Sequence, residues 1–234
     1  MKLIYDLHTH TVFSHGKGSI EDNVKIAKQK GLTKIAITDH GPEHFSFALK
    51  RKNLPLMRAE CDRLSKEYGI EVLLGIEANL LDKTGRIDVK EEDKKYYDII
   101  IMGYHKLIKF KPKQVWFSLK TKILRTKKQI EENTNAYINA INKYNIKVLT
   151  HLNYGINVNI KRLADACKEK GVLIELNGKR ISFNKEEIEY MKKIGTKFVV
   201  NSDAHKPKTV GETNLGFNYI IKNNIDISNV VNCE

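Results

Sequence analysis

Imidazole and carboxylate side chains occur along this chain at positions that could bind metal ions. The stretch DLHTHTVFSHG alone contains three of the eight histidines, His8, His10 and His15. One residue separates His8 from His10, so in an extended segment both imidazoles point the same way and can reach one ion. Further candidate ligands follow at His40, Glu77, His105, His151, Asp203 and His205.

Seven short apolar segments, rich in Ile, Val and Leu, could position these residues. Apolar runs of this length are typical of strands buried on both faces of a parallel sheet. Segments of helical periodicity alternate with them, which predicts right-handed βα units that close into a barrel or form an open doubly wound sheet. The apolar segments begin near residues 3, 34, 71, 98, 146, 172 and 197.

The predicted helices carry recognisable end signals. Ser19 and Asp22 resemble an N-cap and the acidic partner of a capping box. Gly69, Gly171 and Gly195 stand just past three periodic segments, where a C-cap glycine is expected. Besides the helix after Ser19, the periodicity predicts helices over 54–68, 159–170 and 185–193, and from about 122 to 144.

Nearly all the candidate ligands lie at or just beyond the ends of predicted strands. The carboxyl ends of parallel strands in a barrel meet at one face, so we expect the ligands to converge there. A lone loop histidine is usually a surface or hydrogen-bonded residue, but seven of the eight histidines follow this pattern. His44 alone has no place in it, and we interpret it as a loop residue. Asp39 could orient a ligand or cap the turn that follows.

This ligand set predicts more than one metal ion. Seven imidazoles and two carboxylates exceed the roughly four ligands that one zinc ion takes. A nitrogen-rich set without thiolates suits Zn, Mn or Fe(II) better than Ca or Mg.

Composition limits the class of protein. A chain of 234 residues with 41% hydrophobic content can bury one large core, which predicts a single domain over 1–234. No apolar run approaches the roughly 18 residues of a membrane span, and no signal peptide is recognisable. Cys61, Cys167 and Cys233 lie far apart, which fits ordinary thiols in the reducing cytoplasm. The formal charge of +13 would attract phosphorylated metabolites or nucleic acid.

Taken in order, the motifs resemble the PHP family, named for polymerase and histidinol phosphatase, and most of all its stand-alone bacterial phosphatases. The motifs are DLHTHTVFSHG, AITDHGPEHF, GIEAN, IMGYHK, LTHLN, IELN and NSDAH, and the match runs from residue 3 to about 216. The resemblance implies an α/β fold, a distorted (β/α)7 TIM-like barrel, with three metal ions at the carboxyl ends of its strands. Zn is the favoured ion, with Mn or Fe as alternatives.

The resemblance also distributes the ligands. The histidine of SHG at position 15 is similar to the phosphatase branch, whereas several nuclease-like relatives have SDG. The sequence THLN departs from the proline and glycine that many relatives have after the histidine at 151, so this loop is not expected to follow the family. The first ion would take His8, His10, Glu77 and Asp203, the second Glu77, His105 and His151, and the third His15, His40 and His205.

The implied reaction is hydrolysis of small phosphomonoesters by a metal-activated hydroxide, without a covalent phosphoenzyme. Glu77, Asp203 and His205 are the expected catalytic residues, and family membership suggests histidinol phosphate as one substrate. Asn177 could orient a phosphate or cap the end of its strand. Lys106, Lys179 and Arg180 are basic candidates for substrate binding.

Alternatives from other classes stay open. The ligands alone do not exclude C–N hydrolysis, because amidohydrolases share related barrels and metal chemistry, although the lysine-based or single-carboxylate bridge on which they usually rely is not located here. Residues 106–128 carry nine basic residues and no acid, interleaved with Phe110, Trp116 and Phe117. This composition could bind the backbone and bases of a single-stranded nucleic acid, as in a PHP-type nuclease. Alternatively, the segment forms a loop over the active site whose aromatic residues pack on the barrel. A metal-binding module without turnover is disfavoured, because an open multinuclear ligand set has no evident structural purpose.

Overall fold

Seven parallel strands form the centre of the protein, in a computed structural model that describes residues 1–105, 117, 119–121 and 126–234. Each strand pairs with the next one in the chain, in the order β1-β2-β3-β4-β5-β6-β7, which confirms the predicted (β/α)7 barrel. The strands are β1 (Tyr5–Thr9), β2 (Lys34–Ile37), β3 (Glu71–Asn79), β4 (Ile99–Gly103), β5 (Ile146–Leu149), β6 (Leu173–Asn177) and β7 (Phe198–Asn201).

The first and last strands approach each other and nearly close the barrel. Ala204, just after β7, donates its N–H to the carbonyl of His8 at 3.2 Å and accepts a hydrogen bond from the N–H of His10 at 2.8 Å. The buried carboxylate of Asp6 strengthens this junction, since it accepts hydrogen bonds from the backbone and hydroxyl of Ser202. The end of β1 is therefore placed beside the segment that follows β7.

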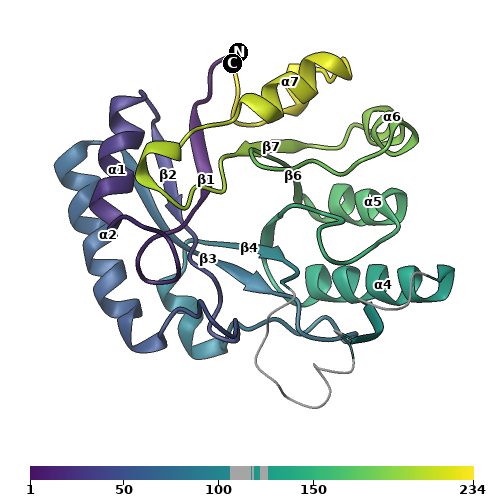
Figure 1. Cartoon of the computed structure of the whole chain (residues 1–234), viewed down its shortest axis with the longest axis horizontal. Coiled ribbons are helices and arrows are strands. Elements are labelled where there is room, and N and C mark those ends of the chain that lie inside the picture. The colour runs from purple at the N-terminus through teal and green to yellow at the C-terminus, as the bar shows by residue number, and fades with distance from the viewer. Residues whose placement is uncertain (106–116, 118, 122–125) are drawn as a thin grey trace.

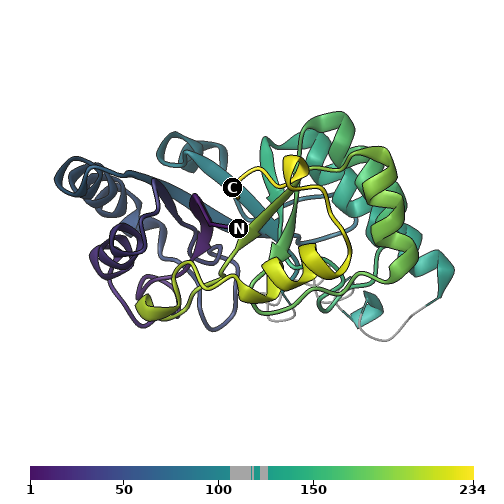
Figure 2. The same cartoon turned by 90° about the horizontal axis from the view of Figure 1, so that it is seen from above.

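Helices flank the strands on two sides. Figures 1 and 2 show α1 and α2 on one side and α4, α5 and α6 on the other, with the strands between them. The α-helices are α1 (Ile20–Gln29), α2 (Leu54–Tyr68), α4 (Lys127–Lys143), α5 (Ile160–Lys170), α6 (Lys185–Ile194) and α7 (Asn214–Lys222). Short 3-10 helices span Arg51–Asn53, Glu91–Tyr96, Pro207–Thr209 and Ile227–Asn229.

The predicted helix ends are confirmed. The Ser19 side chain accepts from the N–H of Asp22, and the Asp22 side chain accepts from the N–H of Ser19, which completes a capping box. Gly69, Gly171 and Gly195 end their helices in the left-handed conformation, with φ between 61° and 71°. The helix predicted from about residue 122 is present from Lys127, whereas 122–125 lie outside the described residues.

The barrel interior changes from apolar to polar toward the carboxyl ends of the strands. A small apolar cluster draws residues from all seven strands, among them Val199 of β7 and Leu173 of β6. Alternate residues of a strand share a face, so two residues further along these same faces lie Asn201 and Glu175. Both side chains are buried. The sequence thus builds an apolar floor with a polar layer above it.

The described part of the chain bears on the predictions about membrane spans and cysteines. No helix there is long and apolar enough to span a membrane. All three cysteines are free thiols, with Cys61 and Cys167 buried and Cys233 partly buried.

Candidate metal centre

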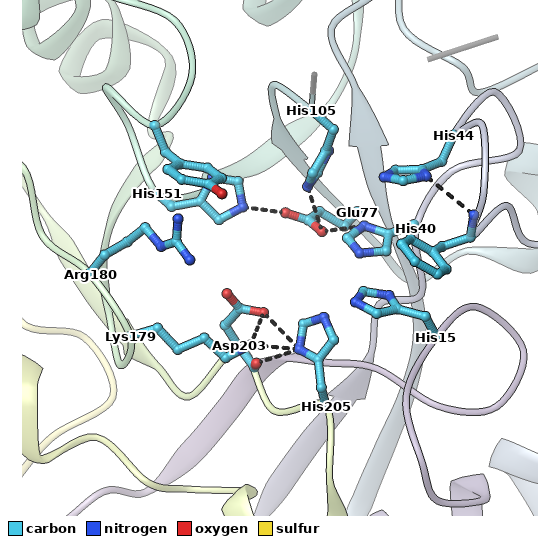
Figure 3. Close-up of a pocket in the computed structure, with 12 residues that line it drawn as sticks. His15, His40, His44, Glu77, His105, His151, Lys179, Arg180, Asp203 and His205 are labelled. Atoms are coloured by element: carbon cyan, nitrogen blue, oxygen red, sulfur yellow. Dashed lines mark hydrogen bonds and ion pairs between the residues drawn. The ribbon is translucent and has the colours of Figure 1, made fainter. Parts of the chain in front are cut away.

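The predicted metal ligands converge at the carboxyl ends of the strands. Many of them line a pocket of about 660 Å³ (Figure 3). His8 and His10 lie beneath it and are almost completely buried. A register shift in β1 between Asp6 and Thr9 accompanies this arrangement. The ligand candidates in the pocket wall are His15, His40, Glu77, His105, His151, Asp203 and His205.

Glu77 of β3 is the centre of this cluster. Its Oε1 lies 2.8 Å from His151 Nε2 and 3.4 Å from His8 Nε2. Its Oε2 lies near three other imidazoles, at 2.8 Å from His40 Nδ1, 3.4 Å from His105 Nε2 and 3.7 Å from His10 Nε2. Burial alone would raise the pKa of the Glu77 carboxyl, but the surrounding histidines hold it well below its usual value. Glu77 is therefore an anion at neutral pH.

Asp203 forms the opposite wall. Its Oδ1 lies 3.4 Å from His10 Nε2, 3.3 Å from His205 Nδ1 and 3.1 Å from Lys179 Nζ. Asp203 has a φ of 54°, and His151 has a φ of 28°. Left-handed backbone is costly for residues other than glycine and is concentrated at functional sites. The strained backbone at His151 and Asp203 therefore supports a functional role for these two side chains.

Several buried nitrogen atoms at this centre have no hydrogen-bond partner among the described residues. They include Nε2 of His8 and both ring nitrogens of His10. A buried polar atom without a partner costs roughly 1–3 kcal/mol, so their grouping calls for an explanation. A divalent cation would use one lone pair from each of these imidazoles, and imidazole with carboxylate is a ligand set that Zn, Mn and Fe accept. The residues therefore fit a metal centre.

The protonation states suit the same conclusion. Burial lowers the pKa of His10 to about 3 and that of His40 well below its usual value, so both are neutral at pH 7. Neutral imidazole is the form that binds a cation. Burial also acts on His8, but the carboxylates of Glu175, Glu77 and Asp203 raise its pKa well above the usual value. A cation at this position would replace the proton on His8.

The donor groups correspond only in part to the ligand sets that the resemblance implies. His8, His10 and Asp203 form one close donor group, in which the candidate ligand atoms all lie within 4.8 Å of one another. Glu77, the fourth member of the first expected set, is not part of this group. The second expected set is divided, since Glu77 groups with His8 and His151 in one case and with His40 and His105 in another. His10, rather than His15, joins His40 and His205 in the fourth group. His15 nevertheless lies close, with ring centroids 4.1 Å from His205 and 4.8 Å from His40.

Sequence reasoning missed the carboxylate that orients His8. Glu175 of β6 is buried and accepts a hydrogen bond from His8 Nδ1 at 2.8 Å. It also accepts from the N–H of His151 and from the side-chain amides of Asn177 and Asn201. A carboxylate behind a metal-binding histidine fixes its tautomer and ring orientation. The signal in the sequence was the acid inside the apolar run VLIELN.

A second orienting chain lies behind His105 and was also missed. His105 Nδ1 lies 2.5 Å from Asn79 Oδ1, and Asn79 Nδ2 donates to the buried carboxylate of Asp88 at 2.8 Å. Gly41 makes room for this carboxylate, since a Cβ atom there would lie 2.1 Å from Asp88 Oδ2. Asp39 behaves differently, because it accepts hydrogen bonds from Thr11 and Ser14 and so shapes the loop that leads to His15.

His44, interpreted above as a loop residue, is buried in the pocket wall. Its ring stacks on His40 with centroids 4.9 Å apart, and its Nδ1 accepts the N–H of Phe47 at 3.3 Å. Phe47 in turn stacks on His15. This placement depends on how the loop after β2 folds back over the barrel, for which the local sequence gives no signal.

The predicted substrate-binding residues have different placements. Lys179 and Arg180 line the pocket, on the side opposite His15, His40 and His44 (Figure 3). Asn177 is fully buried and outside the pocket lining, where its Oδ1 accepts the N–H groups of Lys179 and Arg180. It therefore caps the strand end and shapes the basic turn instead of facing the pocket. Lys106 lies outside the described residues.

Most of the basic aromatic segment also lies outside the described residues, including Phe110 and Trp116. Phe117 is described, and it is buried against Tyr104 with ring centroids 6.2 Å apart. At this one position, the aromatic side chain packs on the barrel as in the loop interpretation.

Comparison with known proteins places this geometry in context. A family model described as "PHP domain" matches residues 6–179, and one described as "PHP-associated" matches residues 182–229. A protein named "Probable phosphatase" from Caldanaerobacter subterraneus subsp. tengcongensis is 33% identical over 220 residues, which cover 88% of this chain and 77% of that protein. A relative with the same kind of name from Thermoanaerobacter sp. is 33% identical over 226 residues, or 90% of this chain and 82% of the relative.

Among solved structures, the histidinol phosphate phosphatase of Lactococcus lactis subsp. lactis superposes with a TM-score of 0.66 at 20% sequence identity. The match covers 95% of this chain and 94% of that one. That crystal structure contains zinc, L-histidinol and phosphate. At this level of identity the likeness shows a shared fold.

Proposed function

Because this chain belongs to the PHP domain family, we propose that it is a metal-dependent phosphatase that hydrolyses small phosphomonoesters. The names of its relatives support the reaction class. One observation carries the proposal, namely a single buried carboxylate, Glu77, surrounded by five imidazoles at the floor of an open pocket. Such a ligand set has room for substrate above it, unlike a closed structural metal site.

We infer that the centre holds up to three divalent ions, with Zn favoured and Mn or Fe as alternatives. The zinc in the Lactococcus structure supports this order, and so does the nitrogen-rich ligand set. Bound ions would neutralise phosphate oxygens and lower the pKa of a water molecule. The ligands would be His8, His10, His15, His40, Glu77, His105, His151, Asp203 and His205.

Side chains of the pocket would position the ions and bind the phosphate group of the substrate. Glu77 and Asp203, with His205 beside Asp203, are the expected catalytic residues and would hold the ions in the pocket. Lys179 Nζ is 3.1 Å from Asp203 Oδ1, close enough to contact a phosphate bound at the same place. Arg180 adds a planar guanidinium, which suits two-point contact with an anion. We further infer that residues 1–234 act as one domain, because β7 pairs with β6 in the same sheet.

The test is phosphate release by metal-reconstituted protein from histidinol phosphate, sugar phosphates, nucleotides and p-nitrophenyl phosphate, with a single-stranded oligonucleotide as the nuclease arm. Glu77→Ala should lose activity by roughly 1,000-fold, the scale on which one electrostatic group acts in an active site. Glu189→Ala, which removes an exposed carboxylate on α6, should keep wild-type activity. If only the oligonucleotide is degraded, the protein is a nuclease and the proposal is wrong. The proposal is also wrong if the metal-loaded protein hydrolyses none of these compounds.

A further inference from the structure

The described residues of the pocket wall offer no free negative charge to a substrate. Among the described residues that line it, Glu77 and Asp203 are the only acids. Glu77 is surrounded by imidazoles, and Asp203 by imidazoles and Lys179. The negative charges of both carboxylates are therefore already balanced by groups of the metal centre and by Lys179, and neither can pair with a cationic group of a substrate.

The rest of the nearby sequence does not change this balance. Residues 106–128, which follow His105, contain nine basic residues and neither Asp nor Glu. Whatever position its undescribed residues take, this segment cannot supply a carboxylate.

Arg180 lines the pocket beside the metal centre. Its guanidinium carbon stands 3.6 Å from the ring centroid of Tyr154, so the plane of the guanidinium is supported by an aromatic face. Its backbone N–H donates to the buried Asn177 Oδ1, which fixes the turn. No carboxylate of the described residues forms an ion pair with the guanidinium. A planar donor that is pre-positioned and unpaired, at the wall of a pocket, is suited to a carboxylate or phosphate.

Tyr154 links this position to the metal centre. Its ring meets the ring of His151 edge-on, with centroids 5.7 Å apart, and both residues lie in the loop after β5. Figure 3 shows Arg180 pointing into the cavity on the side of His151, away from His44. The guanidinium is thus held beside the ligand cluster.

We propose that the pocket selects a phosphomonoester whose organic part carries a second anionic group, and that Arg180, stacked on Tyr154, binds that group. The inference deepens the proposed function and rests on it for the identity of the first group as a phosphate ester. It also implies discrimination against amine-bearing phosphates such as histidinol phosphate. An ammonium group in this pocket would meet Lys179 and Arg180, and the described lining residues offer it no carboxylate other than Glu77 and Asp203 of the metal centre.

Binding of non-hydrolysable phosphonates tests the inference whether or not the protein turns over esters. Isothermal titration of metal-loaded protein would compare propylphosphonate, 3-phosphonopropionate and 3-aminopropylphosphonate, which have similar chains but a neutral, carboxylate or ammonium end. We expect 3-phosphonopropionate to bind at least fivefold more tightly than propylphosphonate, and the ammonium compound at least fivefold more weakly. A fourth ligand, propane-1,3-diphosphonate, tells whether a carboxylate or a second phosphate group is preferred.

The Arg180→Gln variant assigns the effect to this residue. The advantage of 3-phosphonopropionate over propylphosphonate should fall to less than twofold in that variant. Lys168→Gln, which removes a positive charge from the exposed surface of α5, should keep the full ratio. Equal binding of the anionic and ammonium ligands to the wild type would overturn the inference. So would an equal weakening of all ligands in Arg180→Gln, because Arg180 would then contact the phosphonate shared by them all.

The two proposals fail in different ways. If the phosphonates show the expected order but no phosphomonoester is hydrolysed, the charge preference stands and the proposed reaction is wrong. If phosphomonoesters are hydrolysed but the phosphonates bind without regard to charge, the reaction stands and the role of Arg180 is wrong.

Discussion

The Nδ1 of His8 donates to the carboxylate of Glu175 at 2.8 Å, with both side chains fully excluded from solvent. Because Nδ1 carries this hydrogen bond, Nε2 of His8, which faces Glu77 and Asp203, is the nitrogen that would give up its proton and offer its lone pair to an ion. We therefore predict that Glu175→Gln weakens metal binding by roughly 10–100-fold, the usual effect of removing such a partner. A glutamine amide cannot accept all four hydrogen bonds that Glu175 accepts. Competition with a chelator of known affinity measures the change, and an unaltered affinity would contradict it.

His15 and His44 form a matched pair of pocket histidines with different predicted roles. Nδ1 of His15 has no hydrogen-bond partner among the described residues, whereas Nδ1 of His44 accepts the N–H of Phe47. We expect His15→Ala to bind one ion fewer than the wild type. His44→Ala should keep the full metal content, because His44 belongs to none of the close donor groups. Elemental analysis after gel filtration gives the stoichiometry, and metal loss from His44→Ala would show that His44 is a ligand.

Metal removal should destabilise the protein. A ligand that binds only the folded state raises the free energy of unfolding, by about 2.7 kcal/mol when its concentration is 100 times the dissociation constant. Adding Zn or Mn to chelator-treated protein should therefore raise the melting temperature, and the rise should shrink in Glu77→Ala. Scanning fluorimetry measures both proteins. An identical rise in the variant would show that the ion binds elsewhere.

Gly41→Ala should disturb His105 from a distance. The added Cβ would collide with the carboxylate of Asp88, which holds Asn79 and through it His105. Overpacking of this kind typically costs about 1–3 kcal/mol, and urea unfolding measures it. Gly31→Ala is the control, since Gly31 has a φ of 75° and open space around it, and should cost about 1 kcal/mol from backbone strain alone. Only Gly41→Ala should also lose metal affinity.

Thiol chemistry should depend on folding. Burial raises the pKa of Cys61 to about 12 and that of Cys233 to about 11, and it also raises the pKa of Cys167. The thiolate is the reactive form, so at pH 8 the folded protein should react with a disulfide reagent at least about tenfold more slowly than the unfolded chain.

Above about pH 8.5 the unfolded thiols ionise while the folded ones stay protonated. Stability should therefore fall as the pH rises through this range.

The fold was largely predictable from the sequence, because it depends on patterns that repeat locally. Apolar runs marked the strands, and the end signals at Ser19, Gly69, Gly171 and Gly195 marked helix boundaries that the structure confirms. The convergence of the histidines followed from the geometry of parallel strands alone.

The shell around the ligands could not be predicted in this way. Glu175 sits in a strand whose neighbours are apolar, and its role appears only once β6 lies beside β5 and near β1. The Asp88–Asn79–His105 chain likewise depends on a turn that brings residues from either side of Gly85 together. His44 reaches the pocket through the fold of its loop. These contacts are set by tertiary packing, for which spacing in the sequence gives no rule.

The two oxygens of Glu77 face different donor groups, with His8 and His151 on one side and His40 and His105 on the other. Ions bound to these groups would be thermodynamically linked through one shared carboxylate. Filling one group fixes the orientation that the other requires, and by reciprocity each ion changes the affinity of its neighbour by the same factor. A metal titration of this protein should therefore be described by a coupling constant between ions, and not by a list of independent affinities.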